Sequence, residues 1–225
     1  MKLTWLGHAC WHLNVDGTSI LIDPFFASES IRKIGEAMPV DYILCTHGHA
    51  DHCSDVVSIC KRHPNAVLIG CFELVNWFGK KGVRSVEPGN PGGTIMTSFG
   101  SVTFTFASHS SQMPDGAYGG IAVGFIINTK EGSVYVAGDT GYFNDMEFIG
   151  RSGIKVAIVP IGDRFTMGPE QALEAIKVIK PKWTVPSHYN TWEPIRQDPV
   201  SWAKEVHCQT KTQPLIFQPG ESKEL

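Results

Sequence analysis

The segment THGHADH, residues 46–52, constrains this chain more than any other feature. It places His47, His49, Asp51 and His52 within six consecutive positions. Burying histidine and aspartate side chains at this density without partners is strongly unfavourable. Because alternate residues of an extended segment point the same way, His47 and His49 can converge on one point, while the following turn brings Asp51 and His52 to a neighbouring one. The pattern therefore predicts two adjacent metal ions.

Imidazole and carboxylate donors without a thiolate favour borderline divalent metals. We therefore expect two divalent ions per chain, with zinc as the first choice and manganese, iron or nickel as alternatives. Isolated histidines are more often core or surface residues, and we assign His12, His63 and His207 to that class. His63 ends a predicted helix, where an imidazole interacts favourably with the helix dipole.

The pattern of short apolar runs bounded by Gly, Pro, Asn or Asp predicts a strand-rich α/β (α+β) chain. Strands are expected at residues 2–7, 11–15, 19–23, 41–46, 66–70, 95–99, 101–108, 120–128, 133–139, 156–162, 183–188 and 213–219. Helices are expected at residues 29–36, 55–63, 72–78, 168–180 and 199–207, and a Gly/Pro loop at residues 84–94. Two successive mixed runs indicate two packed sheets covered by helices on both outer faces, in a single domain of residues 1–225.

Three further candidate ligands lie at the ends of predicted strands, and two metal ions need more donors than one short turn supplies. They are His109, Asp139 and His188. Each follows an apolar strand, in the loop position where a rigid sheet places binding residues. A single strand-terminal aspartate is as often a turn or cap residue, so the three candidates gain their weight as a set.

Other segments follow in order along nearly the whole chain: TWLGHAC, LIDPFF, ASHSS, AGDT, PIGDRFTMGP and SHYNTW. Together with THGHADH they resemble the metallo-β-lactamase fold superfamily, and within it a branch of metal-dependent hydrolases related to ascorbate-6-phosphate lactonase. The resemblance implies a four-layer αββα sandwich. It also implies that one ion is held by His47, His49 and His109, the other by Asp51, His52 and His188, with Asp139 bridging both.

The same resemblance implies roles around the ligands. Asp23 matches an aspartate that would orient a ligand histidine, and its alternative role is a turn residue before Pro24. His8 would point toward the metal site and bind or protonate an anionic substrate group, or it would be a hydrogen-bonded loop histidine.

Candidate substrate contacts lie in two segments. Tyr189 and Asn190 follow His188 directly, and Phe165 and Thr166 lie in a loop beside Met167. Met167 and Phe165 suit the core equally well.

The expected chemistry is hydrolysis, because a water bridging two cations loses a proton near neutral pH. We expect a metal-bridging hydroxide to attack a small-molecule ester, lactone or phosphate-bearing substrate, with Asp51 and His8 as the catalytic side chains. A phosphodiesterase acting on a cyclic nucleotide or RNA would use the same ions and is one alternative. A non-catalytic metal-dependent sensor is the other.

Charge and composition limit the partners. The chain has 19 Lys and Arg against 22 Asp and Glu, a net charge of -3, which argues against a broad basic surface for nucleic acid. The six cysteines form no CxxC pair, the N-terminal residues do not read as a signal peptide, and no apolar run approaches membrane length. We expect a cytoplasmic protein with a small-molecule substrate and no membrane partner; a homo-oligomer stays open.

Overall fold

The computed structural model describes residues 1–225, and its frame is a pair of seven-stranded sheets. The first sheet has the strand order β14-β1-β2-β3-β4-β5-β6, with bounds Ser222–Glu224, Lys2–Trp5, Trp11–Val15, Thr18–Ile22, Tyr42–Cys45, Val67–Cys71 and Val86–Gly89. The second has the order β13-β12-β11-β10-β9-β8-β7, with bounds Gln213–Pro214, Trp183–Ser187, Ile154–Pro160, Gly132–Val136, Val123–Thr129, Gly100–Phe106 and Thr94–Thr97.

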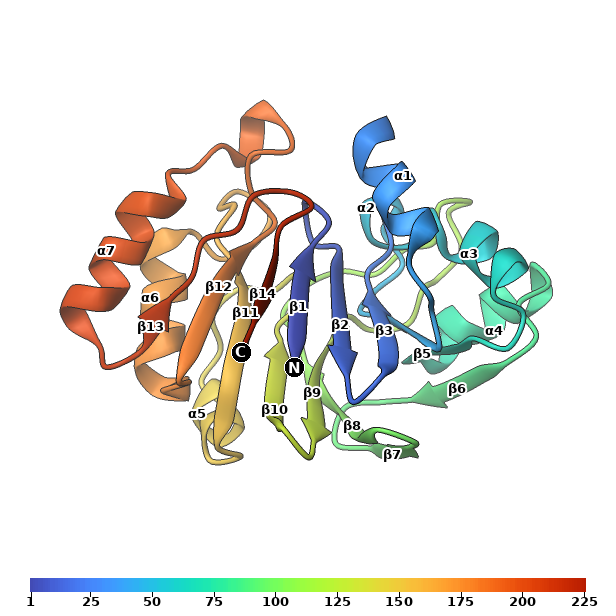
Figure 1. Ribbon diagram of the computed structural model, residues 1–225, viewed down its shortest axis with the longest axis horizontal. Coiled ribbons are helices and arrows are strands. Elements are labelled where there is room, and N and C mark those ends of the chain that lie inside the picture. Colours follow the sequence, from blue (N-terminus) through green and yellow to red (C-terminus); the bar gives the residue numbers. More distant parts are fainter.

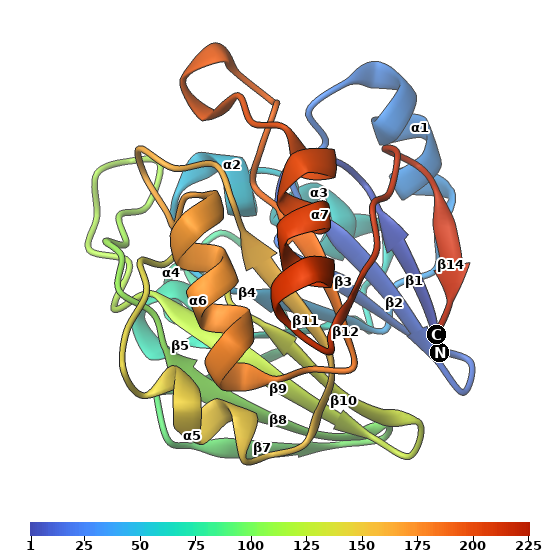
Figure 2. The same cartoon turned by 90° about the vertical axis from the view of Figure 1, so that its left-hand side faces the viewer.

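Helices cover both outer faces of this pair of sheets. Their bounds are α1 (Glu29–Ala37), α2 (Ala50–Cys53), α3 (Val56–Arg62), α4 (Phe72–Lys80), α5 (Met146–Gly150), α6 (Pro169–Ile179) and α7 (Pro199–Gln209), with a 3₁₀ turn at Glu193–Ile195. Figure 1 shows α5, α6 and α7 outside the second sheet and α1 to α4 outside the first. Figure 2 shows the molecule from the side that carries α5, α6 and α7. The arrangement confirms the predicted αββα sandwich.

Strand alternation explains how the first sheet packs on both faces, because successive side chains of a strand point to opposite sides. Ile20 and Ile22 of β3 join a cluster of 40 buried residues that includes Phe104 and Phe125 of the second sheet. Leu21, between them, joins a separate cluster of 19 buried residues with α3 and α4. The larger cluster fixes the two sheets relative to each other.

Several strands end at one edge of the sandwich. Strands β3, β4 and β5 are parallel in the first sheet, as are β10, β11 and β12 in the second. Strand β8 is antiparallel to β9, and β9 is antiparallel to β10, so β8 and β10 point the same way. The N–H of Val123 donates to the carbonyl of Thr46 across the sheets at 3.0 Å. The candidate ligands follow the ends of these strands.

The structure corrects the sequence-based elements at both ends of the first sheet. The expected loop at residues 84–94 contains β6, an edge strand in which Pro88 is tolerated because an edge strand needs fewer backbone donors. The strand expected at residues 213–219 is only Gln213–Pro214. Beyond it the chain crosses to the first sheet, where Ser222–Glu224 pairs with β1. The short helix α5 was not expected either.

None of the helices combines the length and the apolar character that crossing a membrane requires.

Candidate metal centre

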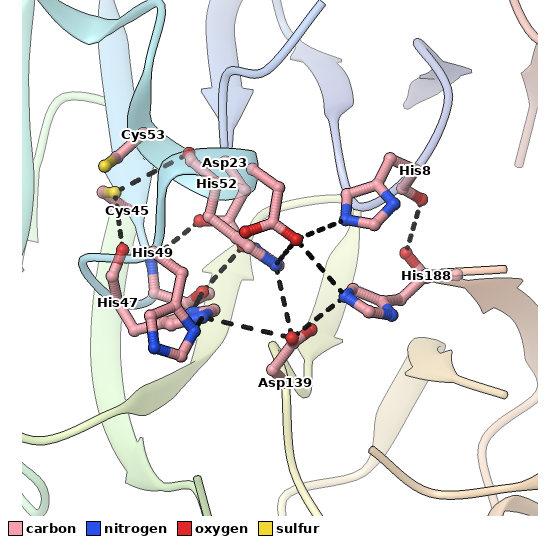
Figure 3. Close-up of polar contacts among 12 residues, drawn as sticks. His8, Asp23, Cys45, His47, His49, His52, Cys53, Asp139 and His188 are labelled. Carbon is pink, nitrogen blue, oxygen red and sulfur yellow. Dashed lines mark hydrogen bonds and ion pairs between the residues drawn. The ribbon is translucent and has the colours of Figure 1, made fainter. Parts of the chain in front are cut away.

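The seven candidate ligands converge at the edge where β4, β8, β10 and β12 end. Figure 3 labels five of them, His47, His49, His52, Asp139 and His188. The side-chain donor atoms of the seven fall into overlapping sets in which all atoms lie within 4.8 Å of one another. These sets are His47, His49 and His109; His8, Asp51, His52 and His188; and His47, His52 and Asp139. Residues from both sheets are thus brought to one place.

The first set contains only imidazoles. Nε2 of His47 lies 3.0 Å from Nδ1 of His49, and the rings of His47 and His109 have centroids 5.1 Å apart. Two nitrogens bound to one tetrahedral zinc at about 2.0–2.1 Å lie about 3.3 Å apart. The separation of the His47 and His49 nitrogens is therefore close to that of two ligands of one ion.

The second set surrounds the carboxylate of Asp51. Its Oδ2 atom lies 3.8 Å from Nε2 of His188, 3.9 Å from Nε2 of His52 and 3.1 Å from Nε2 of His8. The side chain of Asp51 is 28% exposed, whereas the side chains of His8 and His52 are fully buried. Asp51 is therefore the member of this set that solvent reaches most easily.

Asp139 lies between the two sets. Its Oδ2 atom is 3.0 Å from Nε2 of His188, 3.3 Å from Nε2 of His52, 3.6 Å from Nε2 of His109 and 4.0 Å from Nε2 of His47. The preceding Gly138 has φ +64, and a Cβ there would lie 2.9 Å from the carbonyl oxygen of Val123. Only glycine fits this left-handed, tightly packed backbone, which aims Asp139 at the centre.

The ligand turn is held from outside by a loop of the second sheet. The N–H of Gly48 donates to Oγ of Ser111, which donates to the carbonyl of Gly119. A Cβ on Gly48 would lie 2.6 Å from Sδ of Met113. His47 and His49 can flank the turn this closely because Gly48 has no side chain. Residue types alone did not reveal this contact with residues 111–119.

Asp23 anchors the ligand turn and was expected to do so for one histidine. It accepts hydrogen bonds from the N–H and the hydroxyl of Thr46, both at 2.7 Å, and contacts Nδ1 of His52 at 2.9 Å. A carboxylate only accepts, so Nδ1 of His52 carries the hydrogen and leaves Nε2 free to bind a cation.

Thr46 extends the same network to His47 and was missed in the sequence. Its Oγ1 donates to Asp23 and lies 3.0 Å from Nδ1 of His47. Having given its only hydrogen to Asp23, Thr46 must accept from Nδ1 of His47. Nε2 of His47 then carries the lone pair. It accepts from Nδ1 of His49 at 3.0 Å and lies 4.0 Å from Oδ2 of Asp139.

The histidines of the centre fall into two groups, one with lowered and one with raised pKa values. Burial lowers the pKa values of His47, His49 and His109, so these imidazoles are neutral at pH 7. Burial also opposes protonation of His52 and His188, but nearby carboxylates, Asp139 first, outweigh it. They raise the pKa of His52 well above its ordinary value and that of His188 to about 9.

The carboxylates respond in the opposite sense. Burial favours their neutral form, yet the surrounding imidazoles hold the pKa values of Asp51 and Asp139 below the usual range. Two buried or half-buried carboxylates therefore stay ionised, and positive charge on His52 and His188 balances them. Divalent cations bound here would supply that positive charge instead.

Unpaired polar atoms at the centre also fit bound cations. Nε2 of His52, Oδ1 of Asp139 and Nδ1 of His188 are buried and make no hydrogen bond. Buried polar atoms in folded proteins are nearly always paired, so such a group needs a partner. For Nε2 of His52, which belongs to the converging donors, and for the carboxylate of Asp139, whose Oδ2 atom faces four histidines, a metal ion is the partner that matches the donor chemistry.

His8 is held beside Asp51 by hydrogen bonds of its backbone and of its ring. Its carbonyl accepts from the N–H of His188 at 3.0 Å, and its Nδ1 lies 2.8 Å from Oγ1 of Thr191. Since Asp51 only accepts, Nε2 of His8 carries the hydrogen and Thr191 donates to Nδ1. Burial lowers the pKa of His8 to about 4. His8 is thus a neutral hydrogen-bond donor to Asp51, and Thr191, inside the segment SHYNTW, was missed.

The expected substrate contacts lie at different depths. Tyr189 is buried and stacks on Trp5 at 5.1 Å, and Asn190 accepts from the N–H of Gln197 at 2.8 Å. Both line a cavity of about 410 Å³ whose lining also includes His8. Phe165 is exposed.

Two neighbours of Phe165 point inward or along the chain. Thr166 donates to the carbonyl of Met167. Met167 belongs to the hydrophobic core, which was the alternative to a place in the substrate pocket.

The three histidines assigned to ordinary roles lie outside the centre. His12 is buried and hydrogen-bonds to Ser19, His63 ends α3, and His207 is exposed on α7. None of them belongs to a set of converging donors.

Comparison with known proteins also indicates a metal-dependent hydrolase. A family model described as a beta-lactamase superfamily domain matches residues 18–189. The chain is 43% identical to a UPF0173 metal-dependent hydrolase of Methanopyrus kandleri, with 100% of both proteins covered. It is 40% identical to a UPF0173 metal-dependent hydrolase of Thermus thermophilus, covering 98% of this chain and 97% of the relative.

Solved structures give the same picture. Igni18, described as a metallo hydrolase from Ignicoccus hospitalis, superimposes with a TM-score of 0.90 at 35% identity, covering 100% of this chain and 98% of that chain. The metallo-beta-lactamase fold protein YhfI from Bacillus subtilis shares the fold with a TM-score of 0.78 at 16% identity, covering 99% of this chain and 98% of that one.

The matches confirm the predicted superfamily, while the finer link to ascorbate-6-phosphate lactonase stays a prediction. Three observations support the same family: identity of 40% or more over the whole length, the match to the family model, and the converging donor atoms. The chain belongs to the UPF0173 family of metal-dependent hydrolases, within the beta-lactamase superfamily.

Proposed function

We propose that this metal-dependent hydrolase uses two divalent ions to hydrolyse a small-molecule ester, lactone or phosphate-bearing substrate. The observation that carries the proposal is the position of Asp139. Its Oδ2 atom lies 3.0–4.0 Å from the Nε2 atoms of four histidines that come from two different donor sets. A single ion would leave one of these sets without a partner.

The ligand assignment follows the sets. His47, His49 and His109 would hold one ion, Asp51, His52 and His188 the other, and Asp139 would contact both. Of the five ligand imidazoles, three are neutral, and those of His52 and His188 become neutral by losing one proton. No thiolate takes part, which favours zinc, with manganese, iron or nickel as alternatives. We also propose that residues 1–225 act as one domain, because both sheets supply donors.

Divalent ions bound here would ionise a water near neutral pH and polarise the substrate carbonyl or phosphoryl oxygen. Asp51 would orient the attacking water and relay its proton, because its carboxylate accepts hydrogen bonds and is the most exposed of its donor set. His8 donates from Nε2 to Asp51 at 3.1 Å and so fixes which oxygen faces the substrate. In the substrate complex the same N–H can donate to an anionic group or to the leaving oxygen.

The test is turnover of a defined substrate panel by metal-loaded protein. The panel holds a lactone, a p-nitrophenyl carboxylic ester and bis-p-nitrophenyl phosphate. We expect ester or lactone turnover that a chelator removes and zinc restores, and that His49→Ala abolishes while His207→Ala leaves it intact, since His207 is exposed on α7.

Two other results would change the assignment. Turnover of the phosphodiester alone would favour a phosphodiesterase, the first alternative from the sequence. Tight metal binding with no turnover across the panel would favour a metal-dependent sensor. The cytoplasmic location and a homo-oligomer stay predictions from the sequence.

A further inference from the structure

Two partly exposed aromatic side chains lie against His8, on the side of the centre that holds Asp51. The ring of Trp192 is 4.9 Å from that of His8, the ring of Phe25 is 5.7 Å from it, and Phe25 and Trp192 are 6.0 Å apart, all between centroids. Nε2 of His8 is itself 3.1 Å from Asp51. The three rings therefore form a wall directly beside the second donor set.

The two aromatic side chains of this wall are partly exposed and do not contribute to the hydrophobic core. Trp192 is 46% exposed, Phe25 is half-buried, and neither belongs to the two buried hydrophobic clusters. Large apolar side chains that stay open beside a polar centre are typical of ligand-binding surfaces.

The backbone around both aromatic residues is held in place. The carbonyl of Pro24 accepts from the N–H of Asp55 at 3.1 Å, and the N–H of Phe26 donates to Oδ2 of Asp55 at 2.8 Å, so Phe25 is fixed on both sides. The carbonyl of Trp192 accepts from the N–H of Ile195 at 3.1 Å. The backbone that carries the wall is therefore fixed before a substrate arrives, which lowers the entropic cost of binding.

Two arginines in the segments that follow Phe25 and Trp192 are paired with carboxylates. Arg32, from the helix that follows Phe25 and Phe26, pairs with Asp55 at 2.7 Å, and Arg196 pairs with Glu193 at 3.5 Å. No lysine or arginine makes a hydrogen bond or ion pair with a candidate ligand, with His8 or with Thr191. Recognition of a phosphate or carboxylate group usually relies on such donors.

We propose that Phe25 and Trp192 form an aromatic clamp for the uncharged, apolar acyl group of the substrate. This inference rests on the proposed hydrolase function and narrows it to neutral esters or lactones in place of phosphate-bearing ones. The acyl chain packs against the two rings, and the scissile carbonyl then lies next to Asp51 and His188.

The experiment compares two esters with the same leaving group and acyl groups of similar length. These are p-nitrophenyl butyrate, which ends in a methyl group, and mono-p-nitrophenyl succinate, which ends in a carboxylate. With the zinc-loaded full chain we expect kcat/KM to favour the butyrate by about 10-fold or more. In Trp192→Ala and Phe25→Ala the ratio should fall toward one, mainly through KM for the butyrate.

Matched variants separate the clamp from general damage. Trp192→Phe keeps an aromatic face and should keep most of the selectivity. Phe148→Ala removes another exposed phenylalanine, on α5 under Arg151, and should leave the ratio unchanged.

Three outcomes would overturn the clamp. The wild-type protein could prefer the succinate. The alanine variants could slow both esters equally. If zinc-loaded protein hydrolyses neither ester, the clamp and the proposed function fail together, whereas the first two outcomes reject the clamp alone.

Discussion

Replacing Asp23 by Asn tests whether this buried carboxylate prepares the ligand histidines for metal binding. Asp23 is at φ +43, a backbone conformation that asparagine tolerates, so the substitution changes the chemistry and not the fold. The amide nitrogen would replace one oxygen that faces Thr46 and Nδ1 of His52. Two donors would then meet at His52, unless its ring moves its hydrogen to Nε2, the atom that must bind the cation.

The size of the effect follows from the bond that is lost. A hydrogen bond to a charged group contributes about 1.5–3 kcal/mol, and about 1.4 kcal/mol is a factor of ten in affinity. We therefore expect one of the two metal-binding steps of Asp23→Asn to weaken by about 10- to 100-fold, in line with the usual effect of groups that orient metal ligands.

The assay is a competition titration of metal-free protein with zinc and a chelating dye. Asp41→Asn is the matched control, because Asp41 also accepts a backbone N–H, that of Ser19 at 2.8 Å, but lies at the opposite end of β4. This control should lower the stability at most and leave zinc affinity unchanged. If Asp23→Asn binds both ions with wild-type affinity, the tautomer argument is wrong.

Further predictions concern protons, His8 and the backbone. Zinc binding at pH 7 should displace protons from His52 and His188, whose pKa values are both raised, that of His188 to about 9. Zinc affinity should therefore rise with pH toward 9, and calorimetry in two buffers should detect proton release; no release would contradict the charge balance. Thr191→Val should lower kcat about 3- to 10-fold, because the hydrogen bond that orients His8 is lost, and Thr191→Ser should restore it. Gly138→Ala should destabilise the protein by about 1–3 kcal/mol in denaturant unfolding, whereas Gly141→Ala, with nothing within 4 Å of its Cβ, should stay within about 0.5 kcal/mol.

The sequence predicted those parts of the site that depend on local pattern. His47 and His49 alternate after a buried strand, and His109, Asp139 and His188 each follow one, so their convergence required only that the strands share an edge. Strands β4 and β12 belong to parallel sets, and β8 and β10 point the same way on either side of β9, so all four end at one edge. For this reason the seven donors could be named without coordinates.

Other parts depend on contacts between distant segments and could not be predicted. Thr191 is hydrogen-bonded to a residue 183 positions away, and β14 pairs with β1 from the opposite end of the chain. Nothing in the local sequence of Trp192 distinguishes a clamp residue from a core residue. The edge strand β6 was not predicted because it contains Pro88 and Gly89, and strand propensity does not take into account that an edge strand tolerates these residues.

The most direct measurement for the two-metal centre is the metal content of protein loaded with excess zinc and then desalted. Elemental analysis should find two equivalents per chain in the wild type and a lower content in His49→Ala and in Asp139→Ala. Hydrolysis should reach its full rate only as the second equivalent is added. A wild-type protein that saturates at one equivalent, or that is fully active with none, would contradict the account.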